Sequence, residues 1–203
     1  MRLLLELKKL IISAYPRTAN TFFVVALEHI QKKPISIAHH LHVPALAIQG
    51  IKKKIPEIVL VRNPKQAISS LVIREKHISL KQAISAYIKF YEPLLNYKDN
   101  ILTVDFHDIV NDFSSIICDI NSKFDLDLDN YSKDEPIDKD LIFTKIEKNN
   151  KQFNKGKLVE SEVSRPSESR NKLAEHYFHL MEKKKYRESF ERCNFIYKTL
   201  ISQ

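Results

Sequence analysis

The sequence predicts an α/β fold, in which a parallel sheet of about four to five strands is covered by helices on both faces. Four short apolar runs rich in β-branched residues have the length and composition of buried strands. They lie at residues 10–14, 35–38, 57–61 and 101–105. Helical patterns separate these runs, and strands that alternate with helices pair in parallel through right-handed crossovers. We therefore expect a three-layer α/β/α architecture.

The expected helices follow from apolar residues that recur at helical spacing. They lie at residues 20–30, 64–74 and 79–97, and a fourth carries its apolar face from Ile109 to Phe124. Acidic and turn-forming residues predict a surface loop at 125–135, followed by a weaker helix near 139–149. Ser167 can cap the next helix, and the last one aligns apolar residues from Tyr186 to Leu200.

Composition indicates a soluble globular chain with one domain over residues 1–203. Hydrophobic residues make up 43% and charged residues 29%, as in ordinary globular proteins. The apolar start is interrupted by Glu6 and Lys8, so we expect no secretion signal and no membrane span. Cys118 and Cys193 are expected on apolar helix faces, without CxxC or zinc-type spacing. Buried, reduced thiols fit a cytoplasmic location.

The formal charge of +8 would suit nucleic acid, an anionic membrane surface, or an enzyme whose substrate carries several phosphate and sulfate charges. The basic residues are dispersed along the chain and no nucleic-acid recognition motif is present, so no nucleic acid is expected as a partner. With glycine only at Gly50 and Gly156, a glycine-rich phosphate loop of the usual consensus is excluded.

Two segments that directly follow predicted strands carry residues suited to phosphate. The first, residues 15–22, reads YPRTANTF and leads into a helix. It combines a cation, hydroxyl and amide side chains, and exposed backbone N–H groups, which favour anions. The second, residues 62–70, reads RNPKQAISS. Asn63 suits the helix cap and Pro64 the first turn, which leaves Arg62 at the strand end, able to hold a phosphate with two N–H groups.

These segments resemble two motifs of sulfotransferases that use 3′-phosphoadenosine 5′-phosphosulfate (PAPS). The first resembles the 5′-phosphosulfate loop, commonly written YPKSGTTW, and the second the 3′-phosphate motif RNPxDxxxS. In this resemblance Arg17 takes the place of the family's Lys or Arg, Ala19 that of its Gly, and Phe22 that of the adenine-stacking Trp. Arg62 and Ser70 take the places of the 3′-phosphate ligands, with Ser69 as the alternative to Ser70.

The residues from Ala38 to Pro44 resemble the family's KTHLP segment, which implies His40 as the catalytic base, with His39 as the neighbouring candidate. An imidazole can take a proton from an acceptor hydroxyl near neutral pH. A metal site is not expected, because His39 and His40 should point to opposite faces of a strand and no carboxylate completes a ligand set.

The resemblance runs from about residue 10 to residue 110 and implies a compact P-loop-NTPase-like sulfotransferase fold. The cofactor-binding core would span about 8–125 and a helical or lid region about 135–203. The family's RKG loop has no counterpart triplet, and Arg165 occupies its place in the order. We expect His107 to be structural and the polar residues 151–166 to form an acceptor lid. The implied cofactor-binding residues are Arg17, Thr18, Ala19, Asn20, Thr21, Phe22, Arg62, Ser70 and Arg165.

The implied function is transfer of the sulfuryl group from PAPS to a hydroxyl or amine acceptor, without a metal. Arg17 and His40 would be the catalytic residues. One alternative is a P-loop-type nucleotide kinase or other phosphotransferase, although the sequence lacks GxxxxGK[ST] and an evident Walker-B carboxylate. The other is a non-enzymatic basic module that binds nucleotide or nucleic acid. The acceptor and the oligomeric state are open.

Overall fold

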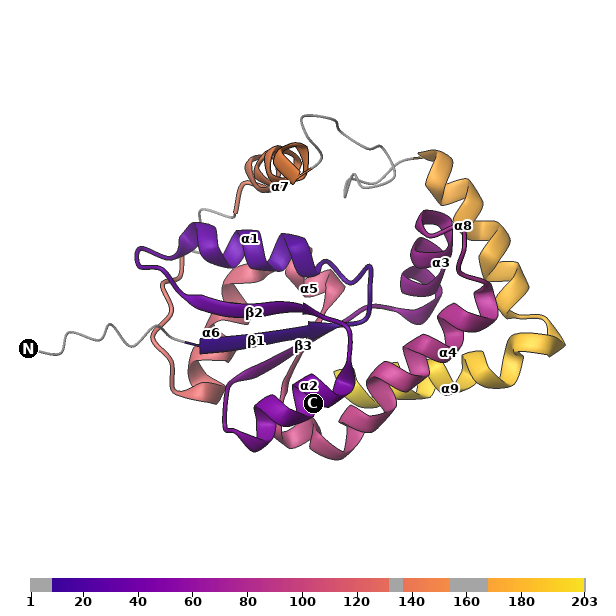
Figure 1. Cartoon of the computed structure of the whole chain (residues 1–203), viewed down its shortest axis with the longest axis horizontal. Coiled ribbons are helices and arrows are strands. Elements are labelled where there is room, and N and C mark those ends of the chain that lie inside the picture. Colours follow the sequence, from indigo (N-terminus) through magenta and orange to yellow (C-terminus); the bar gives the residue numbers. More distant parts are fainter. Residues whose placement is uncertain (1–8, 132–136, 154–167, 203) are drawn as a thin grey trace, which may run out of the picture.

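The computed structural model describes residues 9–131, 137–153 and 168–202 and has a parallel sheet at its centre (Figure 1). Within these residues the sheet has four strands in the order β2-β1-β3-β4. The strands are β1 (Lys9–Ala14), β2 (Ser36–Leu41), β3 (Glu57–Val61) and β4 (Leu102–Asp105). Every neighbouring pair is parallel, so the carboxyl ends of all four strands lie at one edge of the sheet.

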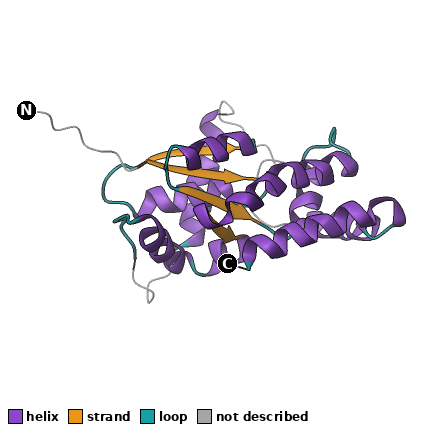
Figure 2. Ribbon diagram, turned by 90° about the horizontal axis from the view of Figure 1, so that it is seen from below, coloured by secondary structure: helices purple, strands orange, loops and turns teal. Residues whose placement is uncertain are grey.

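Helices cover both faces of the sheet, which Figures 1 and 2 show from two directions. One core joins the sheet to α1 (Asn20–Ile30), α5 (Phe106–Asn111), α6 (Phe113–Phe124) and α7 (Lys139–Phe153). The other joins it to α2 (Pro44–Lys52), α3 (Pro64–Arg74), α4 (Leu80–Tyr91), the 3-10 helix η1 (Glu92–Asn100), α8 (Glu168–Met181) and α9 (Lys184–Ile201).

Strand β3 shows why the sheet needs cover on both sides. All five of its residues are buried. Ile58 and Leu60 contribute to the core with α1, whereas Val59 and Val61 contribute to the core with α4. Successive side chains of a strand point to opposite faces, so a continuous apolar run can only be buried between two layers. The predicted α/β class and the parallel sheet covered on both faces are confirmed.

Several element bounds differ from the sequence prediction. Helix α2 was not predicted, and β2 continues to Leu41 instead of ending at residue 38. The helix predicted at 79–97 ends at Tyr91 and gives way to η1, because Pro93 has no N–H and obstructs a continuous α-helix. The helix predicted around Ile109 to Phe124 is divided at Asp112, which has φ −144° and caps α6 through the Ser115 N–H.

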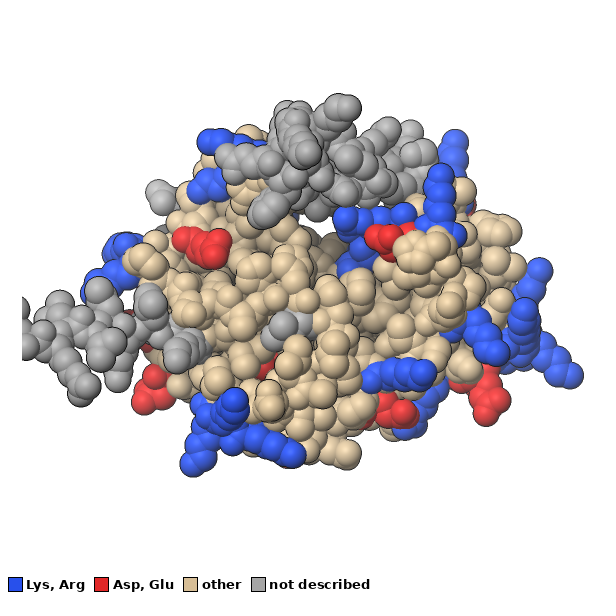
Figure 3. Space-filling model, in the orientation of Figure 1, with Lys and Arg blue, Asp and Glu red and all other residues tan. Residues whose placement is uncertain are grey.

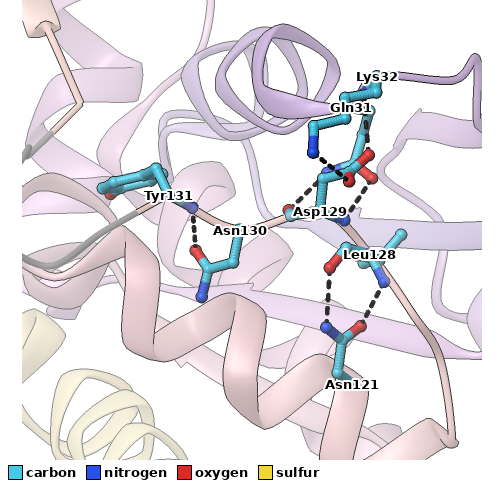
Figure 4. A network of polar contacts seen from close by, with 7 residues as sticks. All are labelled: Gln31, Lys32, Asn121, Leu128, Asp129, Asn130 and Tyr131. Atoms are coloured by element: carbon cyan, nitrogen blue, oxygen red, sulfur yellow. Dashed lines mark hydrogen bonds and ion pairs between the residues drawn. The ribbon is translucent and has the colours of Figure 1, made fainter.

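The segment after α6 is a loop held by side-chain amides, as Figure 4 shows. Both ends of the Asn121 amide bond the backbone of Leu128, at 2.9 and 3.0 Å. Gln31 at the end of α1 bonds the backbone of Asp129 in the same two-sided way, at 2.9 and 3.0 Å. The described part of the predicted loop, residues 125–131, is therefore fixed against α6 and α1. The rest of that loop, at 132–135, lies outside the described residues.

The two cysteines differ in exposure. Cys193 is buried in the core beneath α4, and burial raises the pKa of its thiol to about 12. Cys118 is exposed, so the prediction of a buried thiol was wrong at this position. The buried stripe of α6 runs through Ile117 and Ile120, and a helix turns by about 100° per residue. Cys118 therefore lies beside that stripe. Among the described residues, no helix has the length and apolar character needed to cross a membrane.

Glu57 is a carboxyl group buried at the start of β3, far from the carboxyl edge of the sheet. It is fully buried, and neither carboxyl oxygen has a hydrogen-bond partner within the described residues. Helix α2 passes over it at Gly50, where an added Cβ would lie 3.2 Å from Glu57 Oε2 and 2.3 Å from Ile11 Cδ1. Burial raises the pKa of this carboxyl from 4.5 to about 7. The nearby Ser13 hydroxyl has the smaller effect and lowers the pKa.

Glu57→Gln should therefore change how stability depends on pH. The folded protein keeps the Glu57 proton up to a pKa of about 7, whereas the unfolded chain releases it near 4.5. The free energy of unfolding should fall by up to roughly 3 kcal/mol as pH rises through this interval, and level off above it. In Glu57→Gln this slope should be absent. Urea denaturation at several pH values measures it, with exposed Glu28→Gln as the control; equal slopes in all three proteins would contradict the assignment.

Candidate functional site

The candidate site lies at the carboxyl edge of the sheet, where ligands bind in open parallel sheets. The predicted phosphate segments follow β1 and β3, which are neighbours in the sheet. The predicted histidine segment includes the end of β2, on the other side of β1. The strand order therefore gathers all three segments around the loop after β1. In Figure 3, Lys and Arg side chains border a hollow of the surface that lies between α1 and α3 in the view of Figure 1.

The loop after β1 is curled by two left-handed residues. Arg17 has φ 72° and Ala19 has φ 64°, on either side of the buried Thr18. The Thr18 hydroxyl donates a 2.7 Å hydrogen bond to the carbonyl oxygen of Tyr15, which closes the turn. Ala19 is the N-cap residue of α1 and provides no side-chain cap. A curled backbone that leads into a helix N-terminus is a geometry that binds anions.

The first residues of α1 place an amide group, a hydroxyl group and an aromatic ring next to this loop. Asn20 is only 7% exposed, and neither atom of its amide group has a hydrogen-bond partner among the described residues. Thr21 is half-buried. The Phe22 ring is 4% exposed and packs against Phe143 of α7, with ring centres 5.4 Å apart. Buried amides in native proteins are nearly always satisfied, so the Asn20 side chain indicates a polar group that it would meet.

Arg62 lies at the end of β3 and is held from several sides. Its Nη1 donates to the carbonyl oxygen of Arg17 at 3.1 Å, and its Nε donates to Gln66 Oε1 at 3.2 Å. Its guanidinium carbon lies 4.0 Å from the centre of the Phe106 ring. Burial lowers the pKa of Arg62 to about 10, against the opposing charge of Asp105. The group therefore remains a cation at neutral pH.

The two predicted phosphate segments touch each other directly. Arg17 Nε donates to Ser70 Oγ at 3.1 Å, across 53 residues of sequence. Asn63 caps α3 through the Lys65 N–H at 3.0 Å, and Pro64 follows at the first position, as predicted. Ser69, the alternative to Ser70, is buried and donates to the Gln66 carbonyl of its own helix. Of the two serines, Ser70 is the one whose hydroxyl bonds Arg17.

The histidines form an exposed group at the end of β2. The register of β2 against β1 shifts by one residue after Ala38, and His40 has φ 58°. The rings of His39 and His40 consequently lie together, with centres 4.6 Å apart, so the expectation that they point to opposite faces was wrong. Burial, and then the neighbouring His39 and His42, lower the pKa of His40. His42 Nδ1 lies 2.6 Å from the carbonyl oxygen of Ala14, at the start of the loop after β1.

Two more side chains meet at this edge without having been predicted. Asp105 ends β4, and its carboxylate accepts from the hydroxyl of Tyr197 of α9 at 2.6 Å. The same carboxylate accepts from the backbone N–H of His107 at 2.7 Å and so caps α5. The side chain of His107 is exposed. Only the place of Asp105 at a predicted strand end could have drawn attention to it, because Tyr197 comes from a distant helix.

Arg165 and most of the predicted acceptor lid lie outside the described residues, and residues 151–153 belong to α7. Within the described part of the chain, no group of three or more His, Cys, Asp or Glu residues could hold a metal ion.

Comparisons with known proteins do not show to which family this chain belongs. No protein-family model matches the chain, and no curated protein matches it by sequence. One similar solved structure is the crystal structure of mouse sulfotransferase SULT7A1 complexed with PAP, at 14% identity. The alignment covers 92% of this chain and 89% of that chain, with a TM-score of 0.45. A TM-score below 0.5 does not establish a shared fold, so this likeness supports no conclusion about the chain.

The left-handed backbone of Ala19 predicts how a substitution at this position changes stability. An L-residue in this conformation is strained, whereas glycine adopts it freely. Ala19→Gly should therefore raise the free energy of unfolding by about 1 kcal/mol, since relief of strain exceeds the entropy cost of glycine. Ala86→Gly, at an exposed helical position of α4, should instead lower it by a similar amount. Denaturant unfolding measures both; a loss of stability in Ala19→Gly would contradict the loop geometry.

Proposed function

We infer that this chain is a sulfotransferase that moves a sulfuryl group from PAPS to a hydroxyl or amine acceptor. The observation that carries the proposal is the direct contact between the two segments that resemble the 5′- and 3′-phosphate motifs. The contacting residues are 45 and 53 positions apart, so neither segment alone predicts the contact. The two cations and the Ser70 hydroxyl are thereby gathered at one place. A ligand with phosphate groups at both ends of a nucleoside suits such a place.

The residues at the start of α1 fit the 5′ end of the proposed ligand. Arg17 supplies a cation, and the helix N-terminus supplies backbone N–H groups without a side-chain cap. Asn20 adds a buried amide group without a partner among the described residues, and Thr21 a hydroxyl group. In this proposal Arg17 balances the negative charge that develops on the departing phosphate, which should be the main electrostatic contribution to the rate.

Arg62 and Ser70 fit the 3′-phosphate. Their present contacts to Arg17 keep them beside the loop after β1, and a bound phosphate would take over part of these hydrogen bonds. The half-buried Arg62 cation is attractive for an anion, because charge-assisted hydrogen bonds gain strength away from water. Phe22 is proposed to line the adenine site. Since its ring packs on Phe143, the base would bind at the edge of this aromatic pair.

The proposed base is His40, with His39 as the neighbouring candidate. Its lowered pKa keeps the imidazole neutral at pH 7, which is the form that accepts a proton. The acceptor oxygen or nitrogen would bond to sulfur as the bond from sulfur to the phosphate oxygen breaks, and the acceptor proton would pass to the imidazole. PAPS supplies the activated sulfuryl group. The proposal needs no metal ion, and it includes the cytoplasmic location expected from the sequence.

The cofactor assignment predicts that the chain binds 3′-phosphoadenosine 5′-phosphate more tightly than ADP or AMP. Arg62→Ala should remove most of this preference, since a lost charge-assisted contact costs on the order of 2 kcal/mol, or roughly 30-fold in affinity. Isothermal titration measures all three nucleotides. Arg74→Ala, at the other end of α3, is the control and should keep the preference. Equal affinity of the unaltered chain for the three nucleotides would overturn the assignment.

The chemical assignment predicts different effects for the two catalytic candidates. His40→Ala should lower kcat by about 10²-fold or more and leave cofactor affinity nearly intact. Arg17→Ala should lower both kcat and cofactor affinity. With the unaltered chain, kcat should rise with pH through a pKa below the usual 6.5 of histidine, because His40 must be neutral to act.

These rates require transfer from labelled PAPS to an acceptor found by screening. Full activity of His40→Ala, with activity lost in His39→Ala, would move the base by one residue. Full activity of His39→Ala, His40→Ala and His107→Ala alike would exclude these histidines as the base.

A further inference from the structure

Three buried tyrosines connect the candidate site to α4. Tyr15 opens the loop after β1, and Tyr87 and Tyr91 lie one turn apart on α4. Each is at most 1% exposed. Their ring centres are 5.1 Å apart for Tyr15 and Tyr87, and 4.8 Å apart for Tyr87 and Tyr91. Apolar packing would be served as well by phenylalanine, so the three hydroxyl groups require a separate explanation.

The Tyr91 hydroxyl joins the strands on either side of the site. It accepts the backbone N–H of Tyr15 at 3.2 Å and donates to the carbonyl oxygen of Leu60 at 2.7 Å. The pairing of β1 with β3 ends at Ala14 and Leu60, which are partners in the ladder. The hydroxyl therefore extends this pairing by one bridge, at the point where the first phosphate segment leaves the sheet.

The Tyr87 hydroxyl acts on the second phosphate segment alone. It donates to the carbonyl oxygen of Arg62 at 3.0 Å, immediately before the Asn63 cap of α3. Tyr15 also bonds α4 directly, because its own hydroxyl donates to the carbonyl oxygen of Ala83 in α4 at 3.1 Å. Burial raises the pKa of all three tyrosines, so their hydroxyl groups stay protonated and can donate over the whole physiological range.

We propose that Tyr87 and Tyr91 are positioning residues of the nucleotide site, and that their hydroxyl groups set the spacing between its two phosphate segments. This inference rests on the function proposed above. Tyr91 holds the backbone of the segment before Arg17 against β3, so it should affect every nucleotide with a 5′-phosphate. Tyr87 holds only the backbone of Arg62, so it should affect the 3′-phosphate selectively.

The two variants Tyr87→Phe and Tyr91→Phe remove the hydroxyl groups and keep the rings. With Tyr87→Phe, the preference for 3′-phosphoadenosine 5′-phosphate over ADP should fall about fivefold to tenfold, with ADP affinity within about twofold of the unaltered chain. With Tyr91→Phe, both affinities should fall by a similar factor, so the preference is kept. Tyr186→Phe, whose ring packs against the same core from α9, is the matched control and should change neither.

Isothermal titration of the folded full chain gives the affinities, and amide hydrogen exchange without ligand shows where the backbone is loosened. Tyr91→Phe should speed exchange at Tyr15, and Tyr87→Phe should speed it around Arg62, while β3 stays protected. A purely structural role would lower protection throughout the core in both variants, and it would leave the nucleotide preference unchanged in Tyr87→Phe.

The outcomes separate the two proposals. If the unaltered chain prefers the 3′-phosphorylated nucleotide and both Tyr→Phe variants match it in affinity and preference, the positioning role is wrong and the proposed function stands. If the unaltered chain shows no preference, the proposed function fails and the positioning role fails with it. A loss of preference in Tyr87→Phe together with a uniform loss of affinity in Tyr91→Phe supports both.

Discussion

The hydrogen bond from Arg62 to the carbonyl oxygen of Arg17 is the contact on which the candidate site depends. A partly buried guanidinium group must be compensated, and Arg62 obtains this from a carbonyl oxygen, the Phe106 ring and the charge of Asp105. The carbonyl oxygen of Arg17 can reach it because Arg17 has a left-handed backbone. The same loop conformation lets the Arg17 side chain reach Ser70. The two segments thus form one unit.

The surrounding helices help to hold these two segments in place at the strand ends. The parallel sheet brings the loops to one edge, but the pairing of backbone groups stops where each strand ends. Tyrosine hydroxyls from α4 continue it at β1 and β3, and Tyr197 of α9 bonds the carboxylate at the end of β4. Buried polar groups without such partners would cost about 1 to 3 kcal/mol each. The helices therefore stabilise the loops with polar contacts as well as apolar packing.

Much of the fold could be predicted because its local signals are strong. The Asn63 cap and Pro64 mark the start of α3, and β3 is apolar from Ile58 to Val61. Helix α2 could not be recognised in the same way. Residues 35–51 contain no Asp, Glu, Lys or Arg, so the contrast from which a helical period is read is missing. The structure also gives this helix no side-chain cap.

The contacts among the predicted site residues could not be predicted from the sequence. The sequence placed Arg17 and Arg62 after predicted strands and Ser70 in the helix that follows Arg62. The bonds among them depend on positive φ angles in non-glycine residues, which could not be predicted from the sequence. The shifted register that places His39 beside His40 has the same origin. Helical spacing could place Tyr87 and Tyr91 on one face of α4, but it could not show that their hydroxyl groups bond strand ends.

A crystal structure of the full chain with 3′-phosphoadenosine 5′-phosphate tests the central claim most directly. If the two phosphate segments form one nucleotide site, a single nucleotide should bridge them. Its 5′-phosphate should lie at the N-terminus of α1 beside Arg17, and its 3′-phosphate should contact Arg62 and Ser70. A nucleotide bound away from the carboxyl edge of the sheet, or one that contacts only one of the two segments, would contradict the account.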